Sequence, residues 1–427
     1  MDVETAKRAI RDQEEEITTK LRNEKIITRE FLKGAREVIS SPNALVLKGV
    51  RRCGKSVASI LLAREGRFAY VNFDDPTLAG IHQSDLRTVV EAIYSLKGDF
   101  ETLVLDEVQN AAGWELLVSR LRETKKVIVT GSNASLLSRE FSTSLTGRYV
   151  GFTAFPFSFR EHLDMLGSRP DVHLTKDIAQ TKNLLEGYIR MGGFAETRKF
   201  GERFLLQIYD DIIAKDVERR YNLRFRQTFR DMARYIMSNA AKELTFNKLK
   251  NIFGLSSVHT ARNYVGYLED AYLIFSLQRY HPKLKMQMMA PRKAYCIDTG
   301  IVNILTSSAG EDRGRLMENL VAVELWRRIS YWNPRFTLNY WKNHVGEEAD
   351  FVRREGQAVK SLIQVCYDPS DPETRKREVG GILKASEALS CKDMTVVTWE
   401  YEARERAGAG WISFVPLWKW LLSGGGR

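Results

Sequence analysis

The sequence of 427 residues has little of what marks secreted, zinc-binding or membrane proteins. Its four cysteines lie far apart and show neither a pairing pattern nor zinc-ligand spacing, so we expect a reducing, cytoplasmic environment. No apolar run reaches the roughly 18 residues that a membrane-spanning helix needs, so we expect no membrane partner. The opening stretch MDVETAKRAIRDQEEEITTK is charged throughout, and we expect no signal peptide.

Positive charge is concentrated in one segment of the chain. Between Arg219 and Lys293 there are 15 lysines and arginines and 4 aspartates and glutamates, an excess that equals the net charge of +11 of the whole chain. Such a confined basic excess is typical of a nucleic-acid-binding module. A solvated basic surface, or a groove for an acidic partner, would show the same charge. We expect DNA to bind through residues 219–293.

Residues 31–157 alternate short apolar stretches with segments of helical length. Near-continuous apolar strands joined by helices indicate a parallel sheet covered on both faces. We therefore expect an α/β fold with this core preceded by a helix and linker over 1–30. Beyond the core we expect a helical segment over 158–240, a compact helix-turn-helix unit with strands over 241–305, and a C-terminal α/β domain over 306–427.

The stretch GVRRCGKS fits the phosphate-binding loop pattern G-x-x-x-x-G-K-[ST]. A strand candidate precedes it and a helix candidate follows it, so backbone N–H groups and a helix N-terminus would face phosphate oxygens. Lys55 would reach the terminal phosphates of ATP, and Ser56 would hold Mg²⁺. The candidate ATP-binding residues are Gly49, Arg51, Arg52, Cys53, Gly54, Lys55 and Ser56.

Two further strand ends supply candidate catalytic residues. In LVLDEVQN, three apolar residues lead into Asp106, which suits Mg²⁺ binding, and Glu107, which suits polarisation of the attacking water. In KVIVTGSN, either Ser132 or Asn133 would sense the terminal phosphate, and the sequence does not choose between them. Arg148 lies directly before another strand candidate, where an arginine could stabilise transition-state charge or serve only the fold.

These motifs together resemble an archaeal and bacterial AAA+ family that combines a P-loop ATPase core with a C-terminal domain of unknown function. The resemblance rests on GVRRCGKS, LDEVQN, TGSN, LTGR, FTAFPFSFREHL and GGFAE, and it spans nearly the whole chain. It implies that residues 158–240 form a helical lid. It also implies that Arg148 occupies the position of the arginine that acts on a neighbouring subunit. This favours a homo-oligomeric ring, and a monomer, as in signalling relatives, is the alternative.

The basic segment predicts a winged helix-turn-helix. In KELTFNKLKNIFGLSSVHTARNYVGYLED, apolar residues recur at helical spacing on both sides of a glycine turn, and the strand candidates YLIFSLQRY and KAYCID follow. Similar modules occur at this position in the family. The second helix would be the recognition helix and would expose His259, Arg262 and Asn263 to DNA. The segment with Lys283 and Lys285 would form a basic wing, and a packing role alone is the alternative.

The C-terminal part resembles the PD-(D/E)xK nuclease fold, whose acids and lysine bind Mg²⁺ and activate water. Carried over residue by residue, Glu318 matches the helix acid, Asp350 matches the strand acid, and Gln364 matches the acid of the next strand. Cys366 stands where the lysine should be. Because a neutral thiol supplies no cation, we expect a vestigial site in a domain kept for binding or assembly. A lysine displaced to Lys360 is the alternative.

The leading hypothesis from the sequence is therefore a Mg²⁺-dependent ATPase whose ATP hydrolysis is coupled to DNA binding or remodelling. One alternative is an ATP-dependent DNA nuclease that uses the C-terminal domain. Another is a nucleotide-switched signalling or scaffold ATPase with little turnover. All three require ATP and Mg²⁺ as cofactors.

Overall fold

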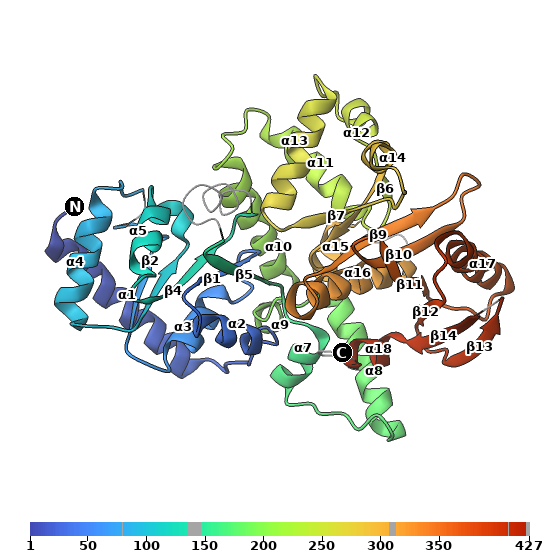
Figure 1. Ribbon diagram of the computed structural model, residues 1–427, viewed down its shortest axis with the longest axis horizontal. Helices are drawn as coiled ribbons and strands as arrows, with labels where there is room; N and C mark the ends of the chain where they lie inside the picture. The colour runs from blue at the N-terminus through green and yellow to red at the C-terminus, as the bar shows by residue number, and fades with distance from the viewer. Residues whose placement is uncertain (79, 135–146, 307–312, 409, 424–427) are drawn as a thin grey trace. The chain divides into compact units, whose positions relative to one another are not determined.

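The computed structural model describes residues 1–78, 80–134, 147–306, 313–408 and 410–423. It divides into two compact units, of which unit 1 comprises Met1–Phe155 and Asp270–Tyr272, and unit 2 comprises Pro156–Glu269 and Leu273–Arg427 (Figure 1). None of the helices in the described ranges is long and apolar enough to cross a membrane.

Unit 1 is built on a five-stranded sheet in the order β2-β3-β4-β1-β5, in which all neighbouring strands run parallel. The strands are β1 (Ala44–Gly49), β2 (Phe68–Asn72), β3 (Thr102–Asp106), β4 (Lys126–Gly131) and β5 (Tyr149–Ala154). The helical segments are α1 (Val3–Asn23), α2 (Leu32–Ile39), α3 (Lys55–Ala63), α4 (Asp85–Lys97), η1 (Val108–Asn110) and α5 (Trp114–Leu121). The parallel α/β core predicted from the sequence is confirmed.

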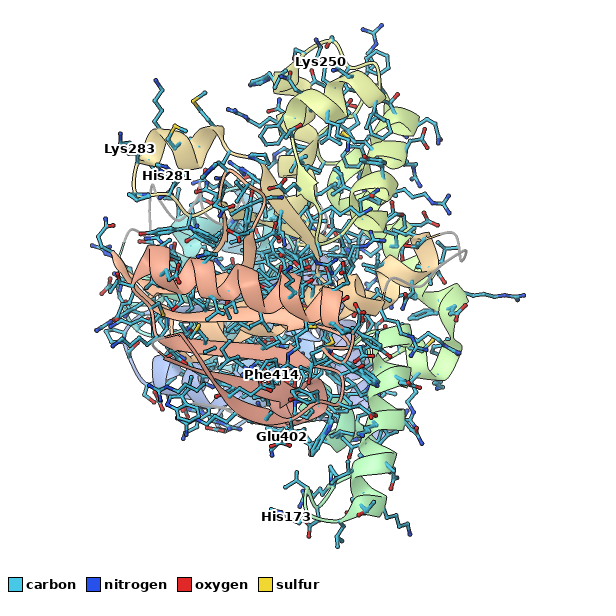
Figure 2. The ribbon with its side chains drawn as sticks, turned by 90° about the vertical axis from the view of Figure 1, so that its right-hand side faces the viewer. His173, Lys250, His281, Lys283, Glu402 and Phe414 are labelled. Atoms are coloured by element: carbon cyan, nitrogen blue, oxygen red, sulfur yellow. The ribbon has the colours of Figure 1, made fainter. Side chains whose placement is uncertain are left out.

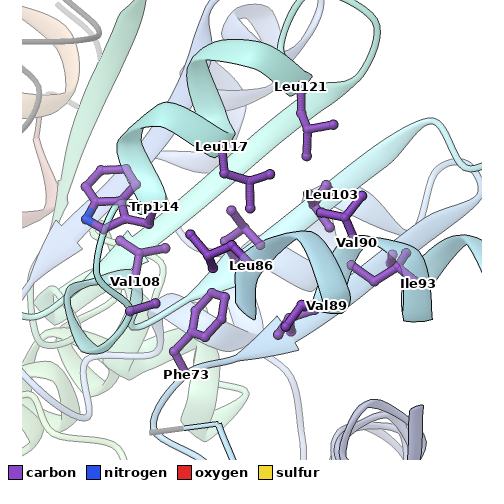
Figure 3. Close-up of a cluster of buried hydrophobic side chains, with 14 of the residues drawn as sticks. Phe73, Leu86, Val89, Val90, Ile93, Leu103, Val108, Trp114, Leu117 and Leu121 are labelled. Carbon is purple, nitrogen blue, oxygen red and sulfur yellow. The ribbon is translucent and has the colours of Figure 1, made fainter. Parts of the chain in front are cut away.

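One face of this sheet packs against α1, α4 and α5 in a continuous apolar cluster (Figure 3). Leu103 and Leu105 of β3 belong to the cluster, whereas Val104 between them does not. Because successive side chains of a strand point to opposite faces, Asp106 faces away from the cluster. It hydrogen-bonds there with Ser56 of α3, so strand parity places Asp106 on the side of the phosphate loop helix.

The N-terminal helix belongs to the core of unit 1. Ala6 and Ile10 of α1 are fully buried in the apolar cluster. Gln13 donates to the backbone oxygen of Asn72 over 3.1 Å and accepts from its backbone N–H over 2.8 Å, which ties α1 to the end of β2. The helix predicted for residues 1–30 is thus present, and it packs on the sheet as part of unit 1.

Unit 2 begins with helices and a small sheet. The helical segments are α7 (Phe159–Leu166), α8 (Thr175–Met191), α9 (Thr197–Phe200), α10 (Glu202–Asp211), η2 (Ile212–Glu218), α11 (Arg226–Ser238), α12 (Phe246–Ile252), α13 (Val258–Asp270), α14 (Leu284–Met289) and α15 (Thr299–Leu305). The sheet has the order β6-β8-β7, with antiparallel neighbours. Its strands are β6 (Glu243–Leu244), β7 (Ile274–Gln278) and β8 (Arg292–Cys296).

The C-terminal part of unit 2 is a mixed six-stranded sheet in the order β13-β14-β12-β11-β10-β9. Its strands are β9 (Phe336–Lys342), β10 (Glu348–Glu355), β11 (Ala358–Cys366), β12 (Asp393–Thr398), β13 (Ala403–Ala407) and β14 (Gly410–Pro416). The helices are α16 (Arg313–Trp332), α17 (Pro372–Leu389) and α18 (Leu417–Leu422). The pair β11 and β12 runs parallel, and β10 pairs with β11 antiparallel.

The GGFAE stretch has a structural role in unit 2. Gly193 donates its backbone N–H to the Asp298 carboxylate over 2.6 Å, and Asp298 also caps α15 through the backbone of Gly300. A Cβ atom on Gly192 would lie 1.9 Å from Asp298 Oδ1, so only glycine fits there. The motif therefore joins the end of α8 to the start of α15.

Candidate functional site

The phosphate loop connects β1 to α3 through several backbone conformations with positive φ, two of them at glycines. Gly49 has φ +144°, and a Cβ atom there would lie 2.1 Å from the carbonyl oxygen of Ala154 on β5. Gly54, directly before α3, has φ +89°, and Arg52 within the loop is also left-handed. These turns fold the loop over the N-terminus of α3, where free backbone N–H groups favour a phosphate group.

Lys55 is buried at the start of α3 and bonds within the loop. Its ammonium group donates to the carbonyl oxygens of Gly49 and Val50 over 3.1 Å each and lies 3.6 Å from the Glu107 carboxylate. Burial disfavours the ionised form of Glu107, but Lys55 and Arg51 outweigh burial and lower the pKa of this carboxyl. Glu107 is therefore a carboxylate at neutral pH, held by the loop lysine.

Asp106 is almost fully buried and is surrounded by hydroxyl groups. Tyr70 donates to Asp106 Oδ2 over 2.7 Å, Thr130 donates to Oδ1, and the Ser56 hydroxyl is also bonded to the carboxylate. Burial and the neighbouring Glu107 raise the pKa of Asp106. Tyr70 and Thr130 were not predicted from the sequence, although they lie on β2 and β4, the two strands that flank β3.

Ser56 and Asp106 together offer the oxygen ligands that Mg²⁺ takes. A hydroxyl and a carboxylate in contact at the foot of a phosphate loop suit this ion, which commonly uses one or two protein ligands and completes its shell with water and phosphate oxygens. Within the described ranges there is no group of three or more histidine, cysteine or acidic side chains placed to hold a metal ion. The donor set fits Mg²⁺ bound together with a nucleotide.

Of the two sensor candidates, Ser132 hydrogen-bonds within the group of side chains around Glu107. Gln109 donates to Ser132 over 3.3 Å and also to the Glu107 carboxylate, and Ser132 contributes a hydrogen bond to Glu107. Asn133 is fully buried beside it. Ser132 is therefore positioned to respond to groups around Glu107.

Arg148 lies at the opposite edge of the sheet from the phosphate loop. Its backbone oxygen accepts from Ala44, the first residue of β1, whereas the loop follows Gly49 at the other end of that strand. Five residues of strand correspond to about 16 Å. Arg148 is exposed and is not brought together with Lys55, and its catalytic role stays a prediction.

A buried arginine from the segment before α2, Arg29, hydrogen-bonds to the backbone of the phosphate loop. Arg29 donates to the carbonyl oxygen of Cys53 over 2.5 Å and to that of Phe155 over 2.6 Å. Cys53 itself is buried, and burial raises the pKa of its thiol, so it contributes packing. No motif marks the stretch around Arg29, so the role of this residue was not predicted.

Comparison with known proteins places these residues in a family. Residues 41–163 match the model of an AAA domain, and residues 182–312 match a domain of unknown function. The uncharacterized protein MJ1544 of Methanocaldococcus jannaschii is 30% identical over 420 residues, which cover 93% of this chain and 92% of that protein. The chain belongs to the MJ1544 family and carries an AAA domain.

Other similar proteins include an uncharacterized protein of Haemophilus influenzae, 25% identical over 88% of this chain and 94% of its own length. Two solved structures also align. The Walker-type ATPase PABY2304 of Pyrococcus abyssi is 15% identical, with a TM-score of 0.44 over 66% of this chain and 96% of its own. AMPPCP-bound DnaA from Aquifex aeolicus is 18% identical, with a TM-score of 0.27 over 57% and 89%. Because both TM-scores are low, neither structure serves as a guide to the arrangement of this chain.

In this AAA-domain chain the predicted DNA-contacting residues lie on α13 and around α14. His259 and Arg262 of α13 are exposed, and the Asn263 side chain contacts His259 over 3.3 Å. Lys283 and Lys285 are exposed as well, and Figure 2 shows Lys283 at the outer surface of unit 2. The five residues are thus accessible from solvent, and DNA binding stays a prediction.

The segment predicted as a basic wing contains a short helix, α14, with an apolar surface. Leu284, Met286, Met288 and Met289 are between 48% and 71% exposed. Two of the basic residues counted in this part of the sequence form ion pairs, because the partly buried Arg230 pairs with Glu218 and the buried Lys293 pairs with Glu318. The basic surface is therefore smaller than the composition suggested.

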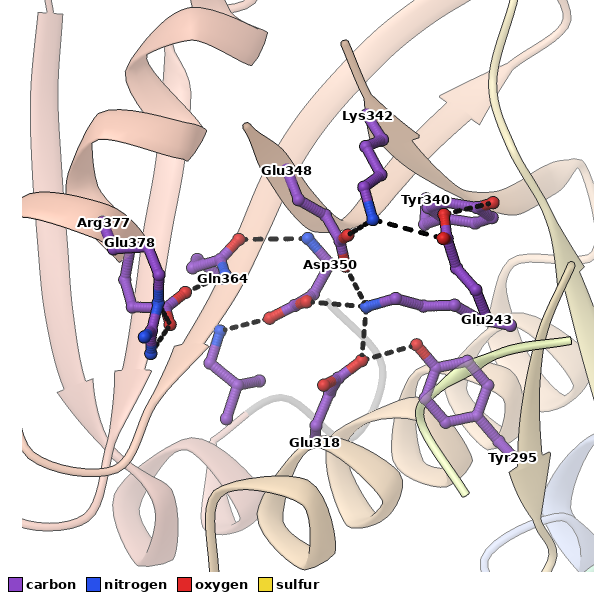
Figure 4. A network of polar contacts seen from close by, with 12 residues as sticks. Glu243, Tyr295, Glu318, Tyr340, Lys342, Glu348, Asp350, Gln364, Arg377 and Glu378 are labelled. Atoms are coloured by element: carbon purple, nitrogen blue, oxygen red, sulfur yellow. Dashed lines mark hydrogen bonds and ion pairs between the residues drawn. The ribbon is translucent and has the colours of Figure 1, made fainter. Parts of the chain in front are cut away.

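Three acids of the C-terminal domain converge on one buried lysine (Figure 4). The ammonium group of Lys293, on β8, lies 2.9 Å from Glu318 of α16 and 3.0 Å from Asp350 of β10, and it also pairs with Glu348. Tyr295 donates to Glu318 over 2.7 Å. We call Lys293, Glu318, Glu348 and Asp350 the carboxylate cluster.

Gln364 hydrogen-bonds to a member of the carboxylate cluster, and Cys366 lies outside the cluster. Gln364 accepts from the backbone N–H of Asp350 over 3.0 Å, whereas Cys366 is buried in an apolar cluster under α17. Burial raises the pKa of Cys366 to about 12, so its thiol carries no charge. Lys360 pairs with Glu355 near the surface. Neither Cys366 nor Lys360 therefore supplies a cation to the carboxylate cluster. Lys293 of β8 supplies it instead, and this was not predicted from the sequence.

Burial and neighbouring charges shift the pKa values of the groups in the carboxylate cluster. Burial and the neighbouring Glu318 raise the pKa of Asp350 to about 8. Burial would lower the pKa of Lys293, but Glu318 and the other acids raise it well above its usual value. The ammonium group therefore stays charged at the centre of the cluster, where a divalent ion would have to sit. The cluster as arranged fits a lysine and does not fit a metal ion.

Proposed function

We propose that this protein hydrolyses ATP with Mg²⁺ and couples the nucleotide state to DNA binding or remodelling. The observation that carries the ATPase part is the meeting of Lys55, Ser56, Asp106 and Glu107 at the carboxyl edge of one parallel sheet. Their four contributions are a cation for phosphate, a hydroxyl and a carboxylate for Mg²⁺, and a second carboxylate for water. The AAA domain matched at residues 41–163 includes all four.

The chain's own residues account for the steps that hydrolysis needs. The loop backbone and Lys55 bind the phosphates, and Ser56 with Asp106 would hold Mg²⁺, which neutralises charge on the phosphate oxygens when it is bound. Because its pKa is lowered, Glu107 is ionised and can accept a hydrogen bond from the attacking water. ATP competes for Lys55, so nucleotide binding releases Glu107 from the contact at 3.6 Å.

The DNA part of the proposal is supported by charge and by chain connectivity. Arg262 and His259 are exposed on α13, and Lys283 and Lys285 are exposed near α14. The residues that follow α13 directly, ending at Tyr272, group with unit 1, which contains the phosphate loop. The proposed DNA-binding helix, α13, therefore leads directly in sequence into residues of the nucleotide-binding unit.

Turnover measured with and without DNA tests this proposal. The expected result is an ATPase rate that rises with duplex or branched DNA and falls to background in Lys55→Ala. Substitution of Lys97, which pairs with Glu14 on the surface of unit 1, by alanine serves as the matched control and should leave the rate unchanged. A rate that no nucleic acid alters, together with no salt-sensitive DNA binding, would refute the coupling.

For the C-terminal domain we propose binding or assembly without DNA cleavage. Support comes from Lys293, which occupies the space between Glu318 and Asp350, and from the uncharged Cys366. The full chain should leave junction, flap and single-stranded DNA intact with Mg²⁺ or Mn²⁺. Cleavage that disappears in Asp350→Asn would instead establish the nuclease function.

A further inference from the structure

A cavity of about 360 Å³ in unit 2 belongs neither to the phosphate loop nor to the carboxylate cluster. Helices α8, α15 and α16 line it, together with Tyr367 and Trp399, which directly follow β11 and β12. Because these two strands run parallel, their carboxyl ends open at the same edge. Such edges are common ligand sites in α/β sheets, and the volume suits a small molecule.

Two aromatic side chains form one wall of the cavity. The rings of Tyr367 and Trp399 stack with their centroids 5.6 Å apart and their planes at 25°. The backbone N–H of Trp399 donates to the carbonyl oxygen of Tyr367 over 3.1 Å, which fixes the two residues side by side. Both are only partly buried. A fixed aromatic wall of this kind binds flat rings, and nucleobases above all, by stacking.

Two arginines lie at the same cavity. Arg313, the first residue of α16, donates to the Tyr367 hydroxyl over 2.9 Å, and its guanidinium group lies 5.9 Å from the centre of that ring. Arg190 of α8 also lines the cavity and is exposed. A planar guanidinium group matches the geometry of a phosphate group. Glu186 and Asn183 add polar groups that can bond to base edges or sugar hydroxyls.

We propose that this cavity binds one nucleotide unit, with its base against Tyr367 and Trp399 and its phosphate at Arg190 and Arg313. The ligand is either a free nucleotide or a nucleotide within a single DNA strand, because both present the same base and phosphate. This site is separate from the ATP site, since it lies wholly in unit 2. It gives the C-terminal domain a binding role that needs no cleavage.

Binding to the full chain carrying Lys55→Ala tests the proposal, because this variant removes the phosphate loop's lysine. The probes are AMP and a short oligodeoxythymidine, measured by equilibrium dialysis. At least one probe should bind, and Arg313→Gln and Trp399→Leu should each weaken that binding by about tenfold or more. Arg335→Gln and Trp411→Leu, at exposed positions away from the cavity, are the matched controls and should bind as before.

The two probes separate the two sources of the ligand. Binding of AMP identifies a free nucleotide, and binding of the oligonucleotide alone identifies a DNA strand. A Lys283→Gln, Lys285→Gln double variant removes the contribution of the α14 region, and the effect of Arg313→Gln should persist in it. The proposal is overturned if neither probe binds, or if both cavity variants bind like the controls. Because the Lys55→Ala chain does not need to turn over ATP, failure here leaves the ATPase proposal standing.

Discussion

The guanidinium group of Arg29 donates to the carbonyl oxygen of Cys53, in the middle of the phosphate loop, from a distance of 2.5 Å. The same side chain donates to Phe155 just after β5, so one buried cation spans the loop and the neighbouring strand. The conformation of the loop therefore depends on a residue well before it in the sequence.

Substitution of Arg29 by methionine should weaken nucleotide binding. The variant loses two charge-assisted hydrogen bonds to the carbonyl oxygens of Cys53 and Phe155, and a bond to a charged group contributes about 1.5–3 kcal/mol. We expect the Kd for an ATP analogue to rise by about tenfold or more, with a lower Tm. Arg36→Met removes an exposed arginine that pairs with Glu65 and should change neither quantity. Equal Kd values for the two variants would contradict this role for Arg29.

Removal of Lys293 should destabilise unit 2 strongly. In Lys293→Met, Glu318, Glu348 and Asp350 remain buried or half-buried without their common cation, and breaking such a buried pair costs about 3–5 kcal/mol. Denaturant unfolding measures the change in free energy of unfolding. Lys360→Met, which removes a half-exposed lysine, is the control and should stay within about 1 kcal/mol of the wild type. A small effect of Lys293→Met would mean that the carboxylate cluster does not stabilise the fold.

The raised pKa of Asp350 predicts a pH dependence of stability. The folded protein holds a proton on Asp350 up to a pKa of about 8, whereas the unfolded chain releases it near the ordinary value of 3.8. Stability therefore falls as the pH rises from about 4 to about 8, by at most about 1.4 kcal/mol per pH unit from this group. Asp350→Asn removes the titration and should gain stability relative to the wild type between pH 5 and 8. The exposed Asp393→Asn should follow the wild type at every pH, and the same behaviour in Asp350→Asn would disprove the shift.

Salt titrations of DNA binding test the contacts around α14. Each lysine that contacts a phosphate contributes about one unit to the slope of log K against log salt. The double substitution of Lys283 and Lys285 by glutamine should reduce that slope by about two. Lys97→Gln, at an exposed position of unit 1, is the control. An unchanged slope in the double variant would place the DNA elsewhere.

The sequence predicted well those sites whose residues are close together in the chain. The phosphate loop and the Asp106–Glu107 pair are short motifs at the ends of strands. Because these strands belong to one parallel sheet, their ends lie at the same edge and the two motifs come together. Glu318, Asp350 and Gln364 were also predicted to meet, through their resemblance to a known fold, and the structure places them around one point.

The contact that the sequence did not reveal in the carboxylate cluster joins strands that are far apart in the chain. Lys293 lies 57 residues before Asp350, and its arrival in the carboxylate cluster depends on how β8 packs beside α16. Arg29 was missed because it lies in a stretch that has no motif. The apolar surface of α14 was not predicted from the segment HPKLKMQMMAPRK. The lysines of this segment suggested a basic wing, and the six residues of α14 are too few to show a clear helical period.

The most direct measurement for the central claim is multiple-turnover ATP hydrolysis by the full chain with Mg²⁺, compared between the wild type and Glu107→Gln. Glutamine keeps the size of the side chain and removes the carboxylate that faces Lys55 at 3.6 Å. The account predicts steady turnover in the wild type, loss in the variant by a factor of about 100 or more, and nucleotide binding retained in both. Equal turnover in the two proteins, or no turnover in the wild type with any nucleic acid present, would contradict it.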